Sequence, residues 1–201
     1  MFKNLTIIIF LIFATCACNK KKSLASDDYI KYLNSKDGGL INLKEFNDIV
    51  FKAKIQTPEM IALSYSSGSE MNQIKYKKDL QDHKGQINFI VLIEDANSNK
   101  KVKEAVVTKE TYGQILAYGN TGLKDDFKLI QGVDTIYCSL VIVEPANSLQ
   151  PIVRIALSFS GVNSLSESDL TLIYNDKIFN QGPIKFNYSK STFQNIPDLK
   201  L

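Results

Sequence analysis

The chain has 201 residues, which is enough for one domain with a self-sufficient hydrophobic core. Its 24 basic and 21 acidic side chains leave a formal net charge of +3, which gives no electrostatic reason to expect a nucleic-acid partner. Arg154 is the single arginine, so the bidentate arginine clamps that recognise phosphates and carboxylates are scarce.

The N-terminus has the order of charge and hydrophobicity that is typical of a secretory signal. Lys3 supplies a positive start, an apolar run extends from Leu5 to Ala14, and the small residue Ala17 precedes Cys18. The apolar run covers about ten residues, half of the roughly 20 that a helix needs to cross a bilayer. We therefore expect no permanent membrane span, and residues 1–17 are predicted to be a cleaved signal peptide.

The segment Thr15-Cys16-Ala17-Cys18 resembles the lipobox of bacterial lipoproteins, which signal peptidase II cleaves. The resemblance implies cleavage after Ala17 and lipid, palmitate included, on the thiol and the new amino group of Cys18. Thr15 departs from the commonest lipobox, where Leu is usual, and Cys16 is a competing acceptor. An ordinary cleaved signal with two incidental cysteines is the alternative. Three acyl chains would make the anchor effectively permanent, at about 0.8 kcal/mol per buried methylene.

Residues 18–25 are predicted to be a lipidated tether, and residues 26–201 a single β-rich domain. Fully extended, Asn19 to Ala25 spans about 25 Å, so the domain is expected to lie close to the lipid. Lysines 20–22 follow the cysteine, whereas surface-exported lipoproteins of Bacteroidetes-type bacteria tend to carry acidic residues there. This comparison implies an outer-membrane anchor that faces the periplasm.

The first half of the domain alternates short helices with strands. Ser26 is a favourable N-cap, which predicts a helix over about 27–36. The apolar period then changes to two, with Asn47-Asp48 as the turn of a hairpin. The run from Ile87 to Ile93 is apolar on both faces, which predicts a central strand. The other expected elements are the hairpin strands within 40–56, helices from Pro58 and over 70–82, a strand over 102–107 and a helix from Thr108 to Gly119.

The pattern changes after Phe127, where short β-prone runs are separated by glycines and prolines. This spacing is typical of antiparallel sandwiches or curved sheets. The predicted fold class is α+β and β-rich, with an antiparallel sheet or β-sandwich in the C-terminal half and a few short helices in the N-terminal half. The tail residues Phe193, Ile196 and Leu199 are apolar and expected to dock. The five runs are Phe127 to Ile130, Thr135 to Val143, Ile152 to Ser160, Leu170 to Tyr174 and Ile184 to Tyr188.

Cys138 would be the only thiol without lipid in the processed chain, so no intramolecular disulfide is expected. It alternates with Ile136, Leu140 and Ile142 in a predicted strand, which indicates a buried, inert side chain. A reactive thiol would instead need exposure and a basic neighbour.

Few residues offer catalytic or metal-binding chemistry. His83 is the only histidine, and its loop-like context favours a solvated role over a catalytic one. One histidine and one free thiol are too few for a zinc site. We therefore expect no cofactor and no metal, although carboxylates and tyrosines leave calcium or a ligand site open. These candidates are Asp125-Asp126, Glu167 with Asp169, Asp176, Tyr65, Tyr76, Tyr118, Tyr137 and Tyr174.

The layout of the domain also resembles uncharacterised Bacteroidetes-type envelope lipoproteins. The shared features are Gly39-Leu40 before the hairpin, Pro58, Tyr174 to Phe179, Ile184 to Phe186, and Ile196-Pro197. The expected function is a membrane-anchored cell-envelope lipoprotein, held in lipid through Cys18, that acts as a non-catalytic module and binds an envelope protein or another part of the envelope. The alternatives are an immunity or inhibitor lipoprotein against a periplasmic toxin, and a hydrolase that uses His83 or a carboxylate pair.

Overall fold

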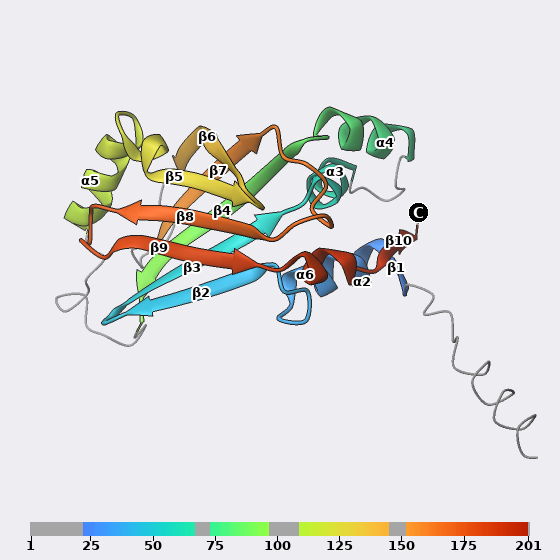
Figure 1. Cartoon of the computed structure of the whole chain (residues 1–201), viewed down its shortest axis with the longest axis horizontal. Helices are drawn as coiled ribbons and strands as arrows, with labels where there is room; N and C mark the ends of the chain where they lie inside the picture. Colours follow the sequence, from blue (N-terminus) through green and yellow to red (C-terminus); the bar gives the residue numbers. More distant parts are fainter. Residues whose placement is uncertain (1–21, 67–72, 97–108, 145–151, 201) are drawn as a thin grey trace, which may run out of the picture.

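A computed structural model describes residues 22–66, 73–96, 109–144 and 152–200. The predicted signal peptide, the lipidation site Cys18 and the predicted strand 102–107 therefore lie outside the described residues. Figure 1 shows the arrangement of the elements. The strands are β1 (Ser23–Ala25), β2 (Ile41–Phe46), β3 (Ile49–Gln56), β4 (Gln86–Asp95), β5 (Phe127–Gln131), β6 (Asp134–Glu144), β7 (Val153–Ser160), β8 (Leu170–Asp176), β9 (Gly182–Tyr188) and β10 (Asp198–Lys200). The helices are α2 (Ser26–Asn34), α3 (Pro58–Ser66), α4 (Gln73–Asp82), α5 (Lys109–Gly119), the 3₁₀-helix η2 (Leu123–Asp126) and α6 (Lys190–Gln194).

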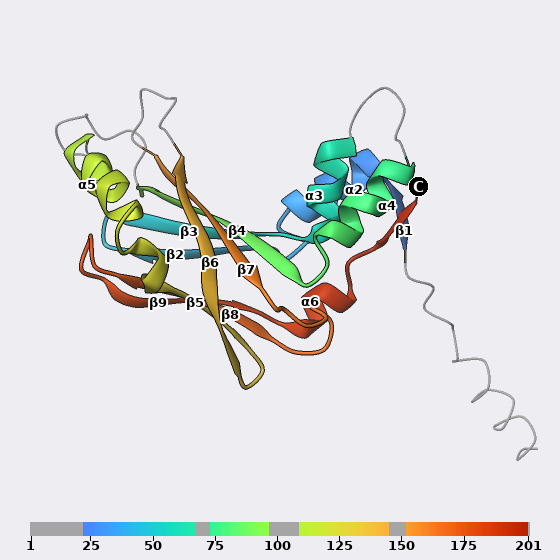
Figure 2. The same cartoon turned by 90° about the horizontal axis from the view of Figure 1, so that it is seen from above.

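Eight strands form one sheet in the order β2-β3-β4-β7-β6-β5-β8-β9, and every neighbouring pair is antiparallel. The sheet curls until its two edge strands meet. Where they meet, Nδ2 of Asn42 in β2 donates a 2.8 Å hydrogen bond to the backbone oxygen of Asn187 in β9. The result is a nearly closed barrel, visible in the two views of Figures 1 and 2. The predicted β-rich α+β class with an antiparallel sheet is confirmed, and β2 to β4 extend that sheet into the N-terminal half.

Alternating apolar residues explain why these segments form strands. In β3 the buried residues Phe51, Ala53 and Ile55 alternate with partly exposed polar ones, and β7 repeats the pattern. The strand β4 lies between β3 and β7, as predicted from its two apolar faces, and even its outward-facing Ile90 is only 6% exposed. Alternation of this kind buries one face of a half-solvated sheet. The inner faces therefore meet in a single core.

Aromatic rings fill much of that core. The rings of Phe127 and Tyr174 stack with centroids 4.4 Å apart, while Phe89 and Phe159 pack edge to face at 5.7 Å. Offset-stacked and T-shaped pairs are the geometries that aromatic quadrupoles favour. The largest fully buried side chains are Tyr174, Tyr188, Phe51, Phe89, Phe127, Phe159, Phe186, Leu33, Leu40, Ile55, Ile87 and Ile93.

A bulge in β6 overturns part of the predicted strand pattern. Cys138 pairs with Phe159 and is buried, as expected, but the register shifts before Leu140, which pairs with Ser158. A bulge inserts one extra residue, so the side chains beyond it change faces. Leu140 and Ile142 are consequently half-exposed instead of sharing the buried face of Cys138.

Four helices, α2, α3, α4 and α6, gather at one end of the sheet, whereas α5 lies at the other (Figures 1 and 2). The short strands β1 and β10 pair in parallel at the helical end. Phe193 is 6% exposed, and Ile196 and Leu199 pack against the core, so the predicted docking of the tail is confirmed. Ser23–Ala25, at the end of the predicted tether, are part of this pairing. No helix in the described ranges is long and apolar enough to cross a bilayer.

Candidate functional site

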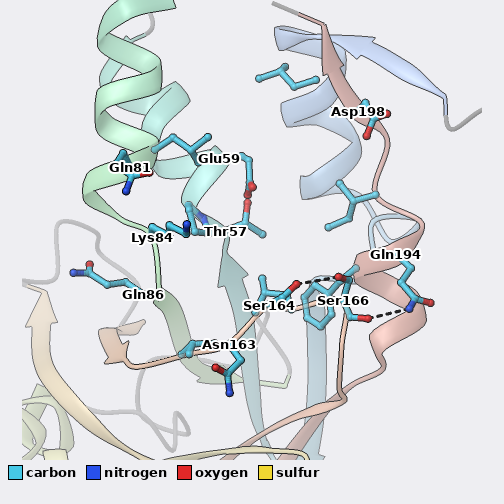
Figure 3. Close-up of a pocket in the computed structure, with 18 of the residues that line it drawn as sticks. Thr57, Glu59, Gln81, Lys84, Gln86, Asn163, Ser164, Ser166, Gln194 and Asp198 are labelled. Atoms are coloured by element: carbon cyan, nitrogen blue, oxygen red, sulfur yellow. Dashed lines mark hydrogen bonds between the residues drawn. The ribbon is translucent and has the colours of Figure 1, made fainter.

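A cleft of about 1010 Å³ opens at the helical end of the sheet. One wall is formed by the start of α3 and the end of α4, and the other by α2, α6 and β10 (Figure 3). The loop that follows β7 lies below them and contributes Ser164 and Ser166. A concave site of this size, with mixed apolar and polar walls, is typical of small-molecule or peptide binding.

Local sequence signals position the first wall. Thr57 is 1% exposed, and its hydroxyl accepts a 3.4 Å hydrogen bond from the backbone nitrogen of Met60, which caps α3. Pro58 then occupies the first helical position, where its missing N–H costs nothing. Glu59 follows in the first turn, where the helix dipole favours a carboxylate. The capped turn thus fixes Glu59 at the cleft.

The loop that follows β7 forms the floor of the cleft and is held by the buried side-chain amide of Gln131. Gln131 is 3% exposed, its Oε1 accepts a 2.9 Å hydrogen bond from the backbone nitrogen of Asn163, and its Nε2 donates to the backbone oxygens of Asn163 and Ser164, both at 3.3 Å. The backbone nitrogens of Gly161 and Val162 also donate to the backbone oxygen of Gly85, at 2.9 and 3.0 Å. The loop is therefore tied to the strands around it.

The opposite wall is fixed to the floor. Nε2 of Gln194 in α6 donates a 2.9 Å hydrogen bond to the backbone oxygen of Ser166, and the hydroxyls of Ser164 and Ser166 lie 3.0 Å apart (Figure 3). The helix α6 is itself capped by Ser189, whose hydroxyl accepts from the backbone nitrogen of Thr192 at 3.3 Å. This part of the cleft presents neutral hydroxyl and amide groups.

Two buried phenols and a carboxylate meet on the cleft lining. Tyr29 of α2 and Tyr76 of α4 are each 4% exposed, and both line the cleft together with Glu59. Burial, and then the charge of Glu59, raises the pKa of Tyr76 to about 12. Burial and the charge of Glu59 also raise the pKa of Tyr29, to which Asp198 adds. Both phenols therefore stay protonated at neutral pH.

The carboxylates that the sequence singled out do not come together in one site. Asp126 is buried, with Oδ1 2.6 Å from Nζ of Lys177 and Oδ2 2.7 Å from the hydroxyl of Tyr118. Oδ1 of Asp176 accepts from the hydroxyl of Tyr174 at 3.1 Å, and the same carboxylate accepts from the backbone nitrogens of residues 178, 179 and 181. Asp125 and Glu167 are exposed, and Asp169 accepts a 2.7 Å bond from the backbone nitrogen of Lys190. Within the described ranges, no three acidic, histidine or cysteine side chains gather as a metal site.

His83 contacts one of the candidate tyrosines, Tyr65. The His83 ring stacks on the Tyr65 ring with centroids 6.1 Å apart, and its Nδ1 lies 3.4 Å from Oε1 of Gln86. Tyr137 is 76% exposed on β6, Tyr174 is in the core, and Tyr118 bonds Asp126. Of the five candidates, only Tyr76 lines the cleft.

Burial raises the pKa of the Cys138 thiol. The thiol donates 3.1 and 3.5 Å hydrogen bonds to the backbone oxygens of Leu140 and Ser158. Reactive cysteines need the opposite, a lowered pKa and access to solvent. Cys138 therefore behaves as a small buried apolar residue.

Sequence reasoning missed Tyr29 and Glu59 as site residues. In the sequence, Tyr29 is explained by the apolar face of a helix, and Glu59 by the preference for an acidic residue in the first turn of a helix. Their meeting depends on how α2 and α3 pack, which no local pattern reports.

No family model, curated protein or solved structure matches the chain.

Proposed function

We propose that the protein is a lipid-anchored, non-catalytic binding module of the bacterial cell envelope, and that the cleft at its helical end is the ligand site. The anchor is the lipid on Cys18, and the expected location is the periplasmic face of the outer membrane. The lipobox-like segment and the following lysines support the anchor and its location. The mixed polar lining of the cleft supports binding.

One observation carries this proposal: the cleft lies at the end of the domain where the described chain begins. The strand β1 starts at Ser23, five residues after Cys18, and pairs with β10, whose Asp198 and Leu199 line the cleft. Five extended residues span about 17 Å. A lipid on Cys18 would therefore hold the cleft near the bilayer, where envelope ligands are found.

The anchor is tested by the mass of the mature N-terminus and by metabolic labelling with palmitate. A Cys18→Ser chain should lose the label and leave the membrane fraction. A Cys16→Ser chain should keep both, because Cys16 belongs to the removed segment. An unmodified cysteine, or an intact leader, would contradict the anchor.

The cleft is tested by site-specific photo-crosslinking in cells. A crosslinking residue at Gln81, which is exposed and lines the cleft, should form adducts with an envelope component. The same residue at Glu45, exposed on β2 away from the cleft lining, should form none of these adducts. Adducts that are absent at Gln81, or equal at both positions, would reject the cleft as the site.

An exposed apolar row on β6 favours the second candidate, an immunity or inhibitor protein that captures a toxin. Tyr137 is 76%, Leu140 51% and Ile142 50% exposed on this strand. Exposed apolar patches often mark protein interfaces. A Leu140→Asp chain should then lose protection against toxin-producing neighbours while a Glu45→Gln chain keeps it. Deletion of the gene without any gain in sensitivity would reject this candidate.

A further inference from the structure

The cleft contains hydrogen-bonding capacity that the fold does not use. The hydroxyls of Tyr29 and Tyr76 form no hydrogen bond with another residue in the described part of the chain, although both side chains are 96% buried and line the cleft. Glu59 likewise forms no ion pair with the described residues. Neither phenol oxygen is among the fully enclosed unpaired atoms of the described residues, so both oxygens open toward the cleft, where they are free to bond a ligand.

The three groups come from three helices and act on one another electrostatically. The charge of Glu59 acts on both phenols, and Tyr76 also acts on Tyr29. Asp198 also acts on Tyr29, and Figure 3 shows Glu59 and Asp198 on opposite walls of the cleft. This corner is therefore rich in oxygen acceptors, negatively charged and partly shielded from water.

A primary ammonium group matches this corner. It carries three N–H donors and no acceptor, and each phenol oxygen and the carboxylate can accept one donor. Hydrogen bonds between an ammonium and a carboxylate are short and strong compared with neutral ones. A neutral hydroxyl would leave the charge of Glu59 uncompensated.

The rest of the lining suits the backbone of a peptide. The neutral side chains and backbone groups around the corner offer both hydrogen-bond donors and hydrogen-bond acceptors, which match the C=O and N–H groups of a peptide. Lys84 is the cation among the lining residues and can pair with a carboxylate of the same ligand. The neutral polar residues are Gln81, Gln86, Asn163, Ser164, Ser166 and Gln194.

We propose that the cleft binds a peptide through a primary ammonium group, with Glu59 as its counter-ion and the phenol oxygens of Tyr29 and Tyr76 completing its hydrogen bonds. This inference rests on the proposed function, since it names the ligand class of the same cleft. The ammonium belongs either to the amino terminus of the peptide or to a lysine-type side chain, and the test separates these two sources.

The test is calorimetric titration of the purified full chain in detergent with the tripeptide Ala-Lys-Ala. Binding should saturate below about 10 mM, and it should weaken as salt rises because opposite charges attract. Acetylation of the side-chain amine or of the α-amine identifies which ammonium binds, because only one modification should abolish binding. The doubly acetylated peptide should not bind.

Variants provide the matched test on the protein. Glu59→Gln keeps the shape of the side chain and should weaken binding at least about tenfold, because it removes a charged partner. Tyr29→Phe with Tyr76→Phe should weaken it severalfold and leave the rings in place. Glu45→Gln makes the same charge change outside the cleft and should leave affinity unchanged. Thermal unfolding verifies that each variant is folded.

Equal binding of the doubly acetylated peptide, unchanged affinity in Glu59→Gln, or no saturation by either free amine would overturn the ammonium inference. Such a result would leave the conclusion from crosslinking at Gln81 unchanged, because that experiment tests the cleft with the ligand that the cell itself supplies. Absent Gln81 adducts would reject the proposed function instead. A neutral oligosaccharide that binds while the peptides do not would identify the other ligand class and reject the inference.

Discussion

The hydroxyl of Tyr188 in β9 donates a 2.9 Å hydrogen bond to the backbone oxygen of Ala53 in β3, across the interior of the curled sheet. Tyr188 is 2% and Ala53 0% exposed, so this bond lies in a dry environment. The bond ties β9, at one edge of the sheet, to β3, which is the neighbour of the other edge strand, β2. The bond helps to hold the barrel nearly closed.

Replacing Tyr188 with Phe tests this link. The change removes one buried hydrogen bond and keeps the ring that packs 6.0 Å from Phe89, so the free energy of unfolding should fall by about 1 kcal/mol. Urea denaturation measures the loss. Tyr137→Phe, at a ring that is 76% exposed, is the control and should change stability little. A loss that is the same in both variants would mean that the bond contributes nothing.

Alkaline pH should destabilise the fold through its buried phenols. Burial is the main cause of the raised pKa of Tyr29, Tyr76, Tyr174 and Tyr188. A phenol with a folded pKa above its ordinary value of 10.0 loses its proton first in the unfolded chain. Its contribution is therefore complete below pH 10 and falls as pH rises, for Tyr76 over the window from 10 to about 12.

Denaturation at several pH values above 9 should show this decline, and phenolate absorbance should rise in step with unfolding. Tyr76→Phe should make the decline shallower, because one of the linked protons is removed. Tyr137→Phe serves as the control with an exposed ring. A folded protein that releases all its phenol protons while its stability stays constant would disprove the linkage.

Several features of the fold could be predicted from sequence because their causes are local. Period-two alternation identified β3, β7 and β9, and two apolar faces identified β4 as central. The bulge after Cys138 could not be predicted, since it depends on how β6 pairs with β7. Three-residue strands such as β1 and β10 carry too little pattern to be recognised. Their pairing joins the two ends of the described chain.

The cleft was hidden from sequence for the same reason. Tyr29, Glu59 and Tyr76 lie on three helices, with the hairpin β2-β3 between α2 and α3, and each has an ordinary local explanation. Only the packing of α2, α3 and α4 brings them to one cleft. Of the carboxylates that the sequence singled out, Asp126 and Asp176 already have several partners within the fold.

The ion pair between Asp126 and Lys177 should lose different amounts of stability when one partner or the other is replaced. The carboxylate is 2% exposed and its lysine partner 57% exposed, with 2.6 Å between Oδ1 and Nζ. Asp126→Asn should cost about 1 to 2 kcal/mol, since it weakens a charged hydrogen bond and leaves the lysine in water. Lys177→Met should cost more, because it leaves a buried carboxylate without its counter-ion.

Chemical denaturation of the two single variants and the double variant tests this order. The double variant should be more stable than the sum of the single losses predicts, because residues in contact couple. Asp125→Asn, at the exposed neighbouring carboxylate, is the matched control. If Lys177→Met is no worse than Asp126→Asn, the lysine does not compensate the buried charge.

Gly39 couples the turn before β2 to helix α6 beside the cleft. Its φ is +64°, and a Cβ there would lie 2.8 Å from Cγ2 of Thr192. Gly39→Ala should therefore cost about 1 to 2 kcal/mol for the backbone, plus the displacement of Thr192. Gly161→Ala has a similar φ of +82° with nothing within 4 Å of the added Cβ, so it should show the backbone cost alone.

Urea denaturation measures the free energy of unfolding of both variants, and the difference between them gives the cost of the contact with Thr192. Thr192→Ser removes Cγ2, so adding it to Gly39→Ala should recover most of that difference. Since Phe193 and Gln194 follow Thr192 and line the cleft, Gly39→Ala should also weaken ligand binding, and the double variant should restore it. Equal losses in Gly39→Ala and Gly161→Ala would show that α6 moves freely away from the turn, and the cleft wall would then owe its position to the Gln194 bond to the floor.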